Sequence, residues 1–169
     1  MPTLETERLA LRPLTLDDAE FILALLNDPS FIRQIGDRGI RTLEGARDYL
    51  RNKPLASYAQ HGVGMYLTSL RADGTPVGIC GLFKRDAHPD FELGFAFMTP
   101  FQQKGYAVEA SRAAIEEGRS KFGAKRIVAV TDRVNTGSLK VLEKLGLRFE
   151  KTFHLPGDPE ELQLFARDY

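Results

Sequence analysis

The sequence has a single cysteine, Cys80, no tryptophan and no excess of either charge. One cysteine cannot form an intramolecular disulfide, and it excludes a zinc site built from several cysteines. The 23 Lys and Arg residues balance 23 Asp and Glu residues, so no basic field is expected to attract nucleic acid or an anionic membrane. The three histidines, His61, His88 and His154, are too scattered to indicate a metal site.

Long apolar runs are also missing. No stretch approaches the ~20 apolar residues that span a bilayer, and the first residues show no basic segment followed by an apolar run. We therefore expect a cytoplasmic protein with no membrane, nucleic-acid or metal partner. A chain of 169 residues without repeats or a long linker is expected to form one domain, residues 1–169, held together by packing. Nothing in the sequence decides the oligomeric state, and a homodimer is left open.

The hydrophobic periods that are present predict the element order β-α-α-β-β-β-α-β-α-β-β. A first helix is expected after Thr15, with a stop at Asn27-Asp28-Pro29, and a second after Thr42, with a kink or an end at Pro54. Two more are expected from the end of the loop at Gly105 up to Phe122 and over 136–145. A turn is expected at His88–Asp90. The strands are predicted at 8–14, 65–70, 77–83, 91–98, 126–131, 147–153 and 161–166. This order indicates a mixed α/β sheet with one strand–loop–helix crossover near its middle.

The strand at 91–98 has an uneven alternation. Phe91, Leu93, Phe95 and Phe97 share one face, while Glu92 lies on the other face beside the small residues at 94 and 96. A carboxylate next to small side chains is typical of the floor of a ligand cleft. The pattern is equally compatible with an edge strand whose Glu92 faces water.

The loop after this strand ends at Gly105 and opens a helix. The predicted buried face of the helix, mostly small, consists of Ala107, Ala110, Ala114, Gly118 and Phe122. Such a junction can aim several backbone amides at one anion, such as a pyrophosphate, with support from the helix dipole. Most junctions of this kind are ordinary connections, so the loop alone is a weak signal. The dinucleotide-binding and P-loop glycine patterns are absent.

Three segments in order carry a more specific signal. They read Thr6-Glu7-Arg8-Leu9-x-Leu11-Arg12-Pro13, then Gln102-x-x-Gly105-x-Ala107-x-Glu109-Ala110, then Asn135-x-x-Ser138-x-x-Val141-Leu142-Glu143-Lys144-Leu145-Gly146. Together they resemble the GNAT superfamily of acetyl-CoA-dependent N-acetyltransferases, and within it the branch that contains ribosomal-protein N-terminal acetyltransferases for alanine and serine. The resemblance implies an α/β (α+β) domain whose mostly antiparallel sheet, flanked by helices, is splayed between strands 91–98 and 126–131 around acetyl-CoA.

The resemblance also implies a binding set for acetyl-CoA. Backbone groups would pair with the pantetheine arm, backbone amides would hold the pyrophosphate, and one asparagine would lie near the thiol end. The residues implied for the pantetheine arm are Phe97, Met98 and Thr99. Those implied for the pyrophosphate are Gln102, Gln103, Lys104, Gly105, Tyr106 and Ala107, and the asparagine near the thiol is Asn135. From its position alone, Asn135 is equally an N-cap for the helix that begins at Thr136, and both roles are compatible.

The implied mechanism is direct attack of a neutral amine on the thioester in a ternary complex. Amines titrate near ~8 to ~10, so a base must take a proton, and Glu92 is the candidate, acting through one water. Ser138 is the residue that the family motif places to protonate the departing thiolate, although a helical serine can also bond to its own backbone. Leu142 stands where many members carry a tyrosine acid, and Cys80 is interpreted as a packing residue.

The acceptor amine is less determined, because the variable segments 30–41 and 154–159 have no decisive pattern. A protein or peptide N-terminal α-amino group ranks first, and a small-molecule amine such as an antibiotic, a polyamine or an amino-acid-like compound ranks second. Two other interpretations stay open: a catalytically silent acyl-CoA-binding domain, and a structural domain in which residues 102–107 form only a turn.

Overall fold

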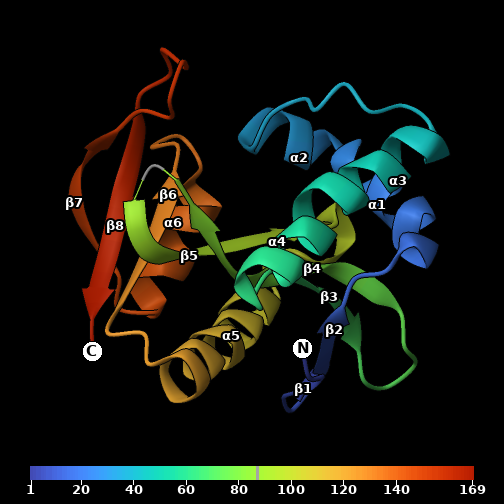
Figure 1. The fold of residues 1–169 in the computed structure, drawn as a ribbon, viewed down its shortest axis with the longest axis horizontal. Coiled ribbons are helices and arrows are strands. Elements are labelled where there is room, and N and C mark those ends of the chain that lie inside the picture. Colours follow the sequence, from blue (N-terminus) through green and yellow to red (C-terminus); the bar gives the residue numbers. More distant parts are fainter. Residues whose placement is uncertain (87) are drawn as a thin grey trace.

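The computed structural model describes residues 1–86 and 88–169, which form an eight-stranded sheet with helices on both of its faces (Figure 1). The sheet order is β1-β2-β3-β4-β5-β6-β8-β7. The strands are β1 (Leu4–Glu5), β2 (Leu9–Pro13), β3 (Met65–Leu70), β4 (Pro76–Arg85), β5 (His88–Phe97), β6 (Arg126–Thr131), β7 (Arg148–Phe153) and β8 (Leu162–Asp168). The helices are α1 (Ala19–Leu26), α2 (Pro29–Gln34), α3 (Leu43–Leu50), α4 (Ala56–His61), α5 (Tyr106–Phe122) and α6 (Thr136–Lys144).

The predicted mixed, mostly antiparallel sheet is confirmed. Neighbouring strands pair antiparallel throughout, except for β5 and β6, which pair in parallel. Two parallel neighbours need a crossover, and α5 supplies it between them. The crossover is the predicted strand–loop–helix unit, and it brings the N-terminus of α5 to the carboxyl ends of β5 and β6.

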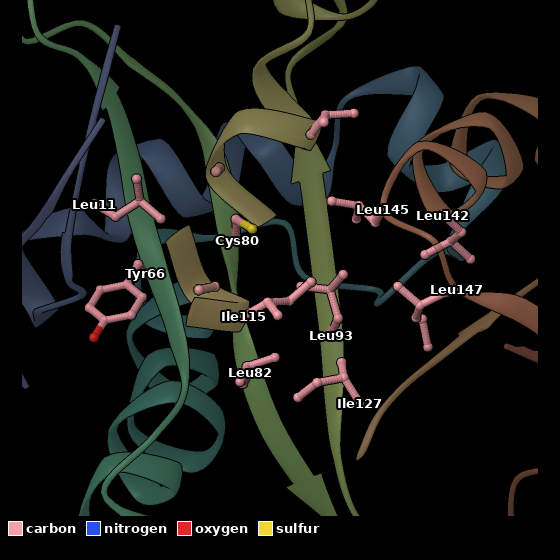
Figure 2. Close-up of a cluster of buried hydrophobic side chains, with 14 of the residues drawn as sticks. Leu11, Tyr66, Cys80, Leu82, Leu93, Ile115, Ile127, Leu142, Leu145 and Leu147 are labelled. Carbon is pink, nitrogen blue, oxygen red and sulfur yellow. The ribbon is translucent and has the colours of Figure 1, made fainter. Parts of the chain in front are cut away.

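The alternation of side chains along β3, β4 and β5 divides the core into two clusters. On one face Tyr66, Cys80 and Phe97 pack under α5 and α6. On the other face Leu67 and Ile79 pack under α1, α2 and α3. Because successive side chains of a strand point to opposite faces, this one sheet can hold a hydrophobic layer on each side. Figure 2 shows side chains of the first cluster, drawn from strands on both sides of the β5–β6 junction.

Small residues let α5 approach the sheet closely, as its sequence predicted. Ala110, Ala114 and Gly118 are buried, and a Cβ at Gly118 would lie 2.3 Å from Cδ1 of Leu82 on β4. The predicted buried face is wrong at its end, because Phe122 is 36% exposed. Helix α5 therefore has a fixed place over β4 and β5, and its N-terminus is positioned with it.

Several local predictions differ from the structure. The turn predicted at His88–Asp90 is wrong, because these residues begin β5. Of the two alternatives predicted at Pro54, a kink or an end, the end is wrong: the proline lies in a π-helical turn, Arg51–Leu55, that leads directly into α4. Helix α2 was missed because Pro29 was interpreted only as a stop, although proline also favours the first turn of a helix.

Candidate functional site

Strands β5 and β6 part shortly after they meet. Their parallel pairing joins only Phe91 to Ile127 and Glu92 to Val128, whereas β5 continues to Phe97 and β6 to Thr131. The predicted splay is therefore present, with Glu92 at the point where the strands diverge. The amide of Met98 donates to Val77 O of β4 at 2.9 Å. Since ladder groups alternate in direction, the amide of Phe97 points away from β4, toward the parted side.

The loop between β5 and α5 presents a row of free amides. The backbone N–H groups of residues 103 to 108 donate to no acceptor within the described residues. Gln103 and Gly105 both have left-handed backbone, with φ of 60° and 82°. Left-handed residues in a turn gather successive N–H groups on one concave side, and the positive end of the α5 dipole adds to them. The loop thus has the chemistry of an anion site and fits a pyrophosphate.

Three other backbone groups predicted for the ligand are engaged within the chain. The Met98 amide is bound by β4, the Thr99 amide donates to Oδ2 of Asp28 at 3.1 Å, and the Gln102 amide donates to Thr99 O at 3.3 Å. Within the described part of the chain, the amides of Phe97 and of residues 103–108 remain available to a ligand. The amides of Met98, Thr99 and Gln102 are therefore taken by β4, by Asp28 and by the loop itself, respectively.

Asp28 anchors this loop to the N-terminal helices. Its Oδ1 accepts hydrogen bonds from the hydroxyls of Ser30 and Thr99, both at 2.7 Å. Gln102 completes the network, because its Nε2 donates to Ser30 Oγ at 2.8 Å and to Phe97 O at 2.9 Å. Although burial acts to raise it, these hydrogen bonds hold the pKa of Asp28 below its ordinary value. The sequence signalled Asp28 only as a helix stop.

Arg8 and Glu109 brace the other side of the loop. Arg8 donates from Nε to Oε2 of Glu109 at 2.7 Å and from Nη1 to Lys104 O at 2.9 Å, and its guanidinium lies 4.5 Å from the centre of the Tyr106 ring. Thr6 donates its hydroxyl to Oε1 of Glu109 at 2.6 Å. The first and second sequence motifs therefore meet at the loop, and Arg8 adds a positive charge beside the free amides.

Glu92 lies inside the protein rather than at an edge. Its side chain is 3% exposed, so the interpretation in which it faces water is wrong. Both of its oxygens accept hydrogen bonds from Arg85, with Nη2 to Oε1 at 2.8 Å, and Nε2 of His88 lies 3.1 Å from Oε2. The sequence analysis missed Arg85 and His88, because the hairpin that brings them to Glu92 was predicted to turn at His88.

The third motif forms the start of α6. Asn135 is the N-cap, since its Oδ1 accepts from the Ser138 amide at 3.1 Å, and its Nδ2 makes no hydrogen bond within the described residues. Ser138 is half-buried, and its hydroxyl has no hydrogen-bond partner among the described residues. Leu142 is 1% exposed in the main core, so it serves packing.

Cys80 is a packing residue, as predicted. It is fully buried with Sγ 3.5 Å from Ser111 Oγ, and burial raises the pKa of the thiol to about 12.

Among the described residues no group of His, Cys, Asp and Glu side chains could hold a metal ion. None of the described helices is long and apolar enough to cross a membrane.

Comparisons with known proteins agree with this geometry. The profile of the family described as "Acetyltransferase (GNAT) domain" matches residues 8–148. YnaD of Bacillus subtilis (strain 168), an uncharacterized N-acetyltransferase, is 28% identical over 148 residues, which cover 88% of this chain and 84% of YnaD. The crystal structure of an acetyltransferase from Agrobacterium tumefaciens str. C58 has a TM-score of 0.83 at 25% identity, covering 100% of this chain and 95% of that one.

Two further solved structures share the fold at lower identity. RimL, a ribosomal L7/L12 α-N-protein acetyltransferase solved with coenzyme A, has a TM-score of 0.82 at 18% identity and covers 99% of this chain and 98% of its own. The ribosomal-protein-S5-alanine acetyltransferase from Vibrio fischeri has a TM-score of 0.79 at 20% identity, with 99% and 97% covered. At identities this low the likeness is one of fold.

Proposed function

The chain belongs to the GNAT family of acetyltransferases and is an N-acetyltransferase, and we propose that it transfers the acetyl group of acetyl-CoA to the α-amino group of a protein or peptide N-terminus. The observation that carries the proposal is the row of free amides at residues 103–108, beside the point where β5 and β6 part. We further propose that residues 1–169 form one N-acetyltransferase domain.

In this proposal the loop and the two strands bind acetyl-CoA. The amides of Gln103, Lys104, Gly105, Tyr106 and Ala107 hold the pyrophosphate, because no described residue accepts their hydrogen bonds and the α5 dipole favours negative charge there. The amide of Phe97 pairs with the pantetheine arm on the parted side of β5. The side chains of Thr99 and Gln102 hold the loop in shape through Asp28 and Ser30.

The reacting groups meet where the strands diverge. Acetyl-CoA supplies an activated acetyl group as a thioester. The amine is mostly protonated at neutral pH, so the cluster of Glu92, Arg85 and His88 takes a proton from it. Ser138, whose hydroxyl has no partner among the described residues, donates a proton to the thiolate and takes up the proton that the amine nitrogen loses as the amide forms. The Nδ2 group of Asn135 lies at the same helix start.

The names of the structural neighbours support an N-terminal α-amino group as the acceptor. Both RimL and the Vibrio fischeri protein are named for acetylating ribosomal proteins, and each matches almost the full length of this chain. A small-molecule amine is the alternative that the experiment decides.

The test measures binding and transfer separately. Calorimetry with CoA, supported by thermal unfolding, is expected to detect binding, since a ligand at ~100 times its Kd adds about 2.7 kcal/mol of stability. Thiol release from acetyl-CoA is then measured with peptides that differ in the first residue, including alanine and serine, and with polyamines and aminoglycosides.

Each acceptor peptide has a matched control with a blocked α-amino group. Turnover with free but not blocked peptides supports the proposal. Turnover only with small amines contradicts the choice of acceptor. Tight CoA binding with no turnover on any amine indicates an acyl-CoA-binding domain, and no binding at all contradicts the assignment of the loop.

A further inference from the structure

Arg8 lies beside the loop between β5 and α5 with one guanidinium nitrogen unused. Nε donates to Oε2 of Glu109 at 2.7 Å and Nη1 donates to Lys104 O at 2.9 Å, whereas Nη2 makes no hydrogen bond within the described residues. The side chain is 43% exposed, so solvent reaches it. A guanidinium that is already held in place and still has free N–H donors can bind an anion at little further cost in conformational entropy.

The free nitrogen lies next to the loop amides that have no partner. Nη2 is 3.2 Å from the point where a Cβ on Gly105 would stand. Because a Cβ and the backbone nitrogen of one residue are about 2.5 Å apart, Nη2 lies within about 6 Å of the Gly105 amide nitrogen. Two hydrogen bonds of about 2.9 Å that meet at one oxygen join donors up to about 6 Å apart. A single phosphate group can therefore accept from Arg8 and from the Gly105 amide together.

The surroundings of Arg8 leave this place open to an anion. Residues 103–105 are exposed, and the guanidinium lies 4.5 Å from the centre of the half-buried Tyr106 ring. The nearby carboxylate of Glu109 is occupied by Thr6 and Arg8, which donate to both of its oxygens. The loop amides carry partial positive charge, and Arg8 adds a full charge at a fixed position beside them.

We propose that Arg8 binds the diphosphate of acetyl-CoA directly through Nη2, next to the free amides of the loop. The proposal rests on the proposed acetyl transfer, and it adds a residue from the first sequence motif to the site that the second motif forms. A hydrogen bond from a guanidinium to a phosphate is charge-assisted and stronger than one from a neutral amide. Arg8 therefore favours acetyl-CoA over acetyl donors that lack a diphosphate, such as S-acetylpantetheine.

The first experiment replaces Arg8 with glutamine, which keeps N–H donors but has no charge. Calorimetry is expected to show that the Kd for CoA rises about tenfold, the loss expected for one charge-assisted hydrogen bond. The Kd for 3′-dephospho-CoA should rise by the same factor, because the contact is with the diphosphate. The Kd of the variant should also depend less on salt concentration than that of the wild type.

The matched control is Arg71→Gln. Arg71 is 47% exposed, its amide donates to Arg8 O at 2.9 Å, and its Nη1 donates to Thr6 O at 2.7 Å. The control removes the same charge from a neighbouring position that does not touch the loop, and it is expected to leave CoA affinity unchanged. Equal CoA affinities in Arg8→Gln and Arg71→Gln would overturn the proposal, as would a loss in Arg8→Gln that is seen with CoA but not with 3′-dephospho-CoA.

A second variant, Arg8→Lys, separates direct binding from support of the loop. Lysine keeps the charge but cannot donate to Glu109 and Lys104 O in the fork geometry of arginine. If Arg8 binds the diphosphate, Arg8→Lys should bind CoA more tightly than Arg8→Gln and keep the salt dependence of the wild type. Equal affinity and equal salt dependence in the two variants would mean that Arg8 only supports the loop, and the proposal would be wrong.

A third measurement uses the wild-type protein, so it does not depend on the folding of a variant. The protein is treated briefly with phenylglyoxal, which modifies accessible guanidinium groups, and the modified residues are found by mass spectrometry. CoA and 3′-dephospho-CoA are expected to protect Arg8 but not Arg71, and pantetheine is expected to protect neither. Equal modification of Arg8 with and without CoA would overturn the proposal.

The proposed function and the role of Arg8 fail in different ways. If the wild-type protein bound no CoA, the proposed function would fail and the role of Arg8 with it. If the wild-type protein bound CoA and a folded Arg8→Gln bound it equally well, the role of Arg8 alone would be overturned.

Discussion

At the scale of single residues, the left-handed backbone of Gln103 and Gly105 decides what the N-terminus of α5 can bind. Both residues have positive φ, and the amides that follow them have no partner in the described chain. Glycine adopts this conformation at no steric cost, whereas any other residue is strained there. The sequence pattern contains Gly105, and it gave no sign that Gln103 shares the conformation.

We predict that Gly105→Asp weakens CoA binding at least tenfold. The new carboxylate would stand beside the amides that we propose to hold the phosphates. Losing one hydrogen bond to a charged group costs about 1.5–3 kcal/mol, and a loss of about 1.4 kcal/mol weakens binding tenfold. Calorimetry with CoA checks the prediction. Gly74→Asp is the matched control, because Gly74 has φ of +76° in a turn with no neighbour within 4 Å. Equal CoA affinities in the two variants would contradict the loop assignment.

Glu92 illustrates how far single residues could be interpreted from the pattern alone. The alternation of β5 placed it on the face opposite Leu93, beside Gly94, and this placement holds. Its partners could not be predicted. Arg85 and His88 reach it only because the β4–β5 hairpin pairs Arg85 with His88, which depends on register and not on spacing in the sequence.

At the scale of elements, the strongest predictions came from long periodic segments. Strands β3 and β6 and the end of α5 match their predicted bounds, because their hydrophobic periods are regular and their ends carry turn residues. Short elements were missed: β1 has two residues and α2 has six. Such elements form because neighbours hold them, as β2 holds β1 in the sheet, and their own periodicity is too short to detect.

The strand glycines provide a test of packing between elements. A Cβ at Gly81 of β4 would lie 2.3 Å from Gly64 O and 2.9 Å from Met65 Cα, so the backbone of the neighbouring strand would have to move. We predict that Gly81→Ala lowers the free energy of unfolding by about 1–3 kcal/mol or more. Urea unfolding measures it.

The control for this experiment is Gly137→Ala in α6, where the nearest atom lies 3.9 Å away and φ is not in the left-handed region. Alanine in a helix is favoured over glycine by about 0.5–1 kcal/mol, so this variant is expected to be neutral or more stable. If both variants lost the same stability, the cost at Gly81 would not come from the close approach of β3 and β4.

At the scale of the whole molecule, buried and half-buried carboxylates connect distant parts of the chain. Burial acts to raise the pKa of Asp18, Asp28 and Glu109, but hydrogen bonds outweigh it and lower the pKa of each carboxylate. The donors are Arg12 and Thr15 for Asp18, Ser30 and Thr99 for Asp28, and Thr6 and Arg8 for Glu109. Asp28 joins α2 to the loop after β5, and Glu109 joins α5 to the start of β2.

These shifts predict the pH dependence of stability. Because the pKa of these carboxyls is lower in the folded protein, the unfolded chain takes up protons first as pH falls. Their contribution to the free energy of unfolding is therefore complete above the ordinary carboxyl pKa near ~4 and is lost as pH falls below it. Raised pKa values at Tyr58 and Cys80, each to about 12 and caused mainly by burial, act in the opposite sense, so stability also falls above ~9 to ~10.

Urea unfolding from pH 3 to 11 is expected to give a plateau between about 5 and 8, with a fall on each side. Asp28→Asn should be less stable than wild type on the plateau and should lose part of the acid limb. A variant with the same acid limb as wild type would indicate that Asp28 does not contribute to it.

The amino-acid sequence by itself determined the mixed sheet, its crossover, the small face of α5 and the glycine motif of the loop before α5, because these depend on local periods and on residues close together in the chain. The tertiary structure alone decided which groups meet. It brings Arg8 to Lys104 and Glu109, Asp28 to Thr99, and His88 and Arg85 to Glu92. Those contacts depend on strand register and on helices packed across the sheet. The choice of which backbone amides remain free for a ligand depends on them too, since an amide is available only when no other part of the fold accepts its hydrogen bond.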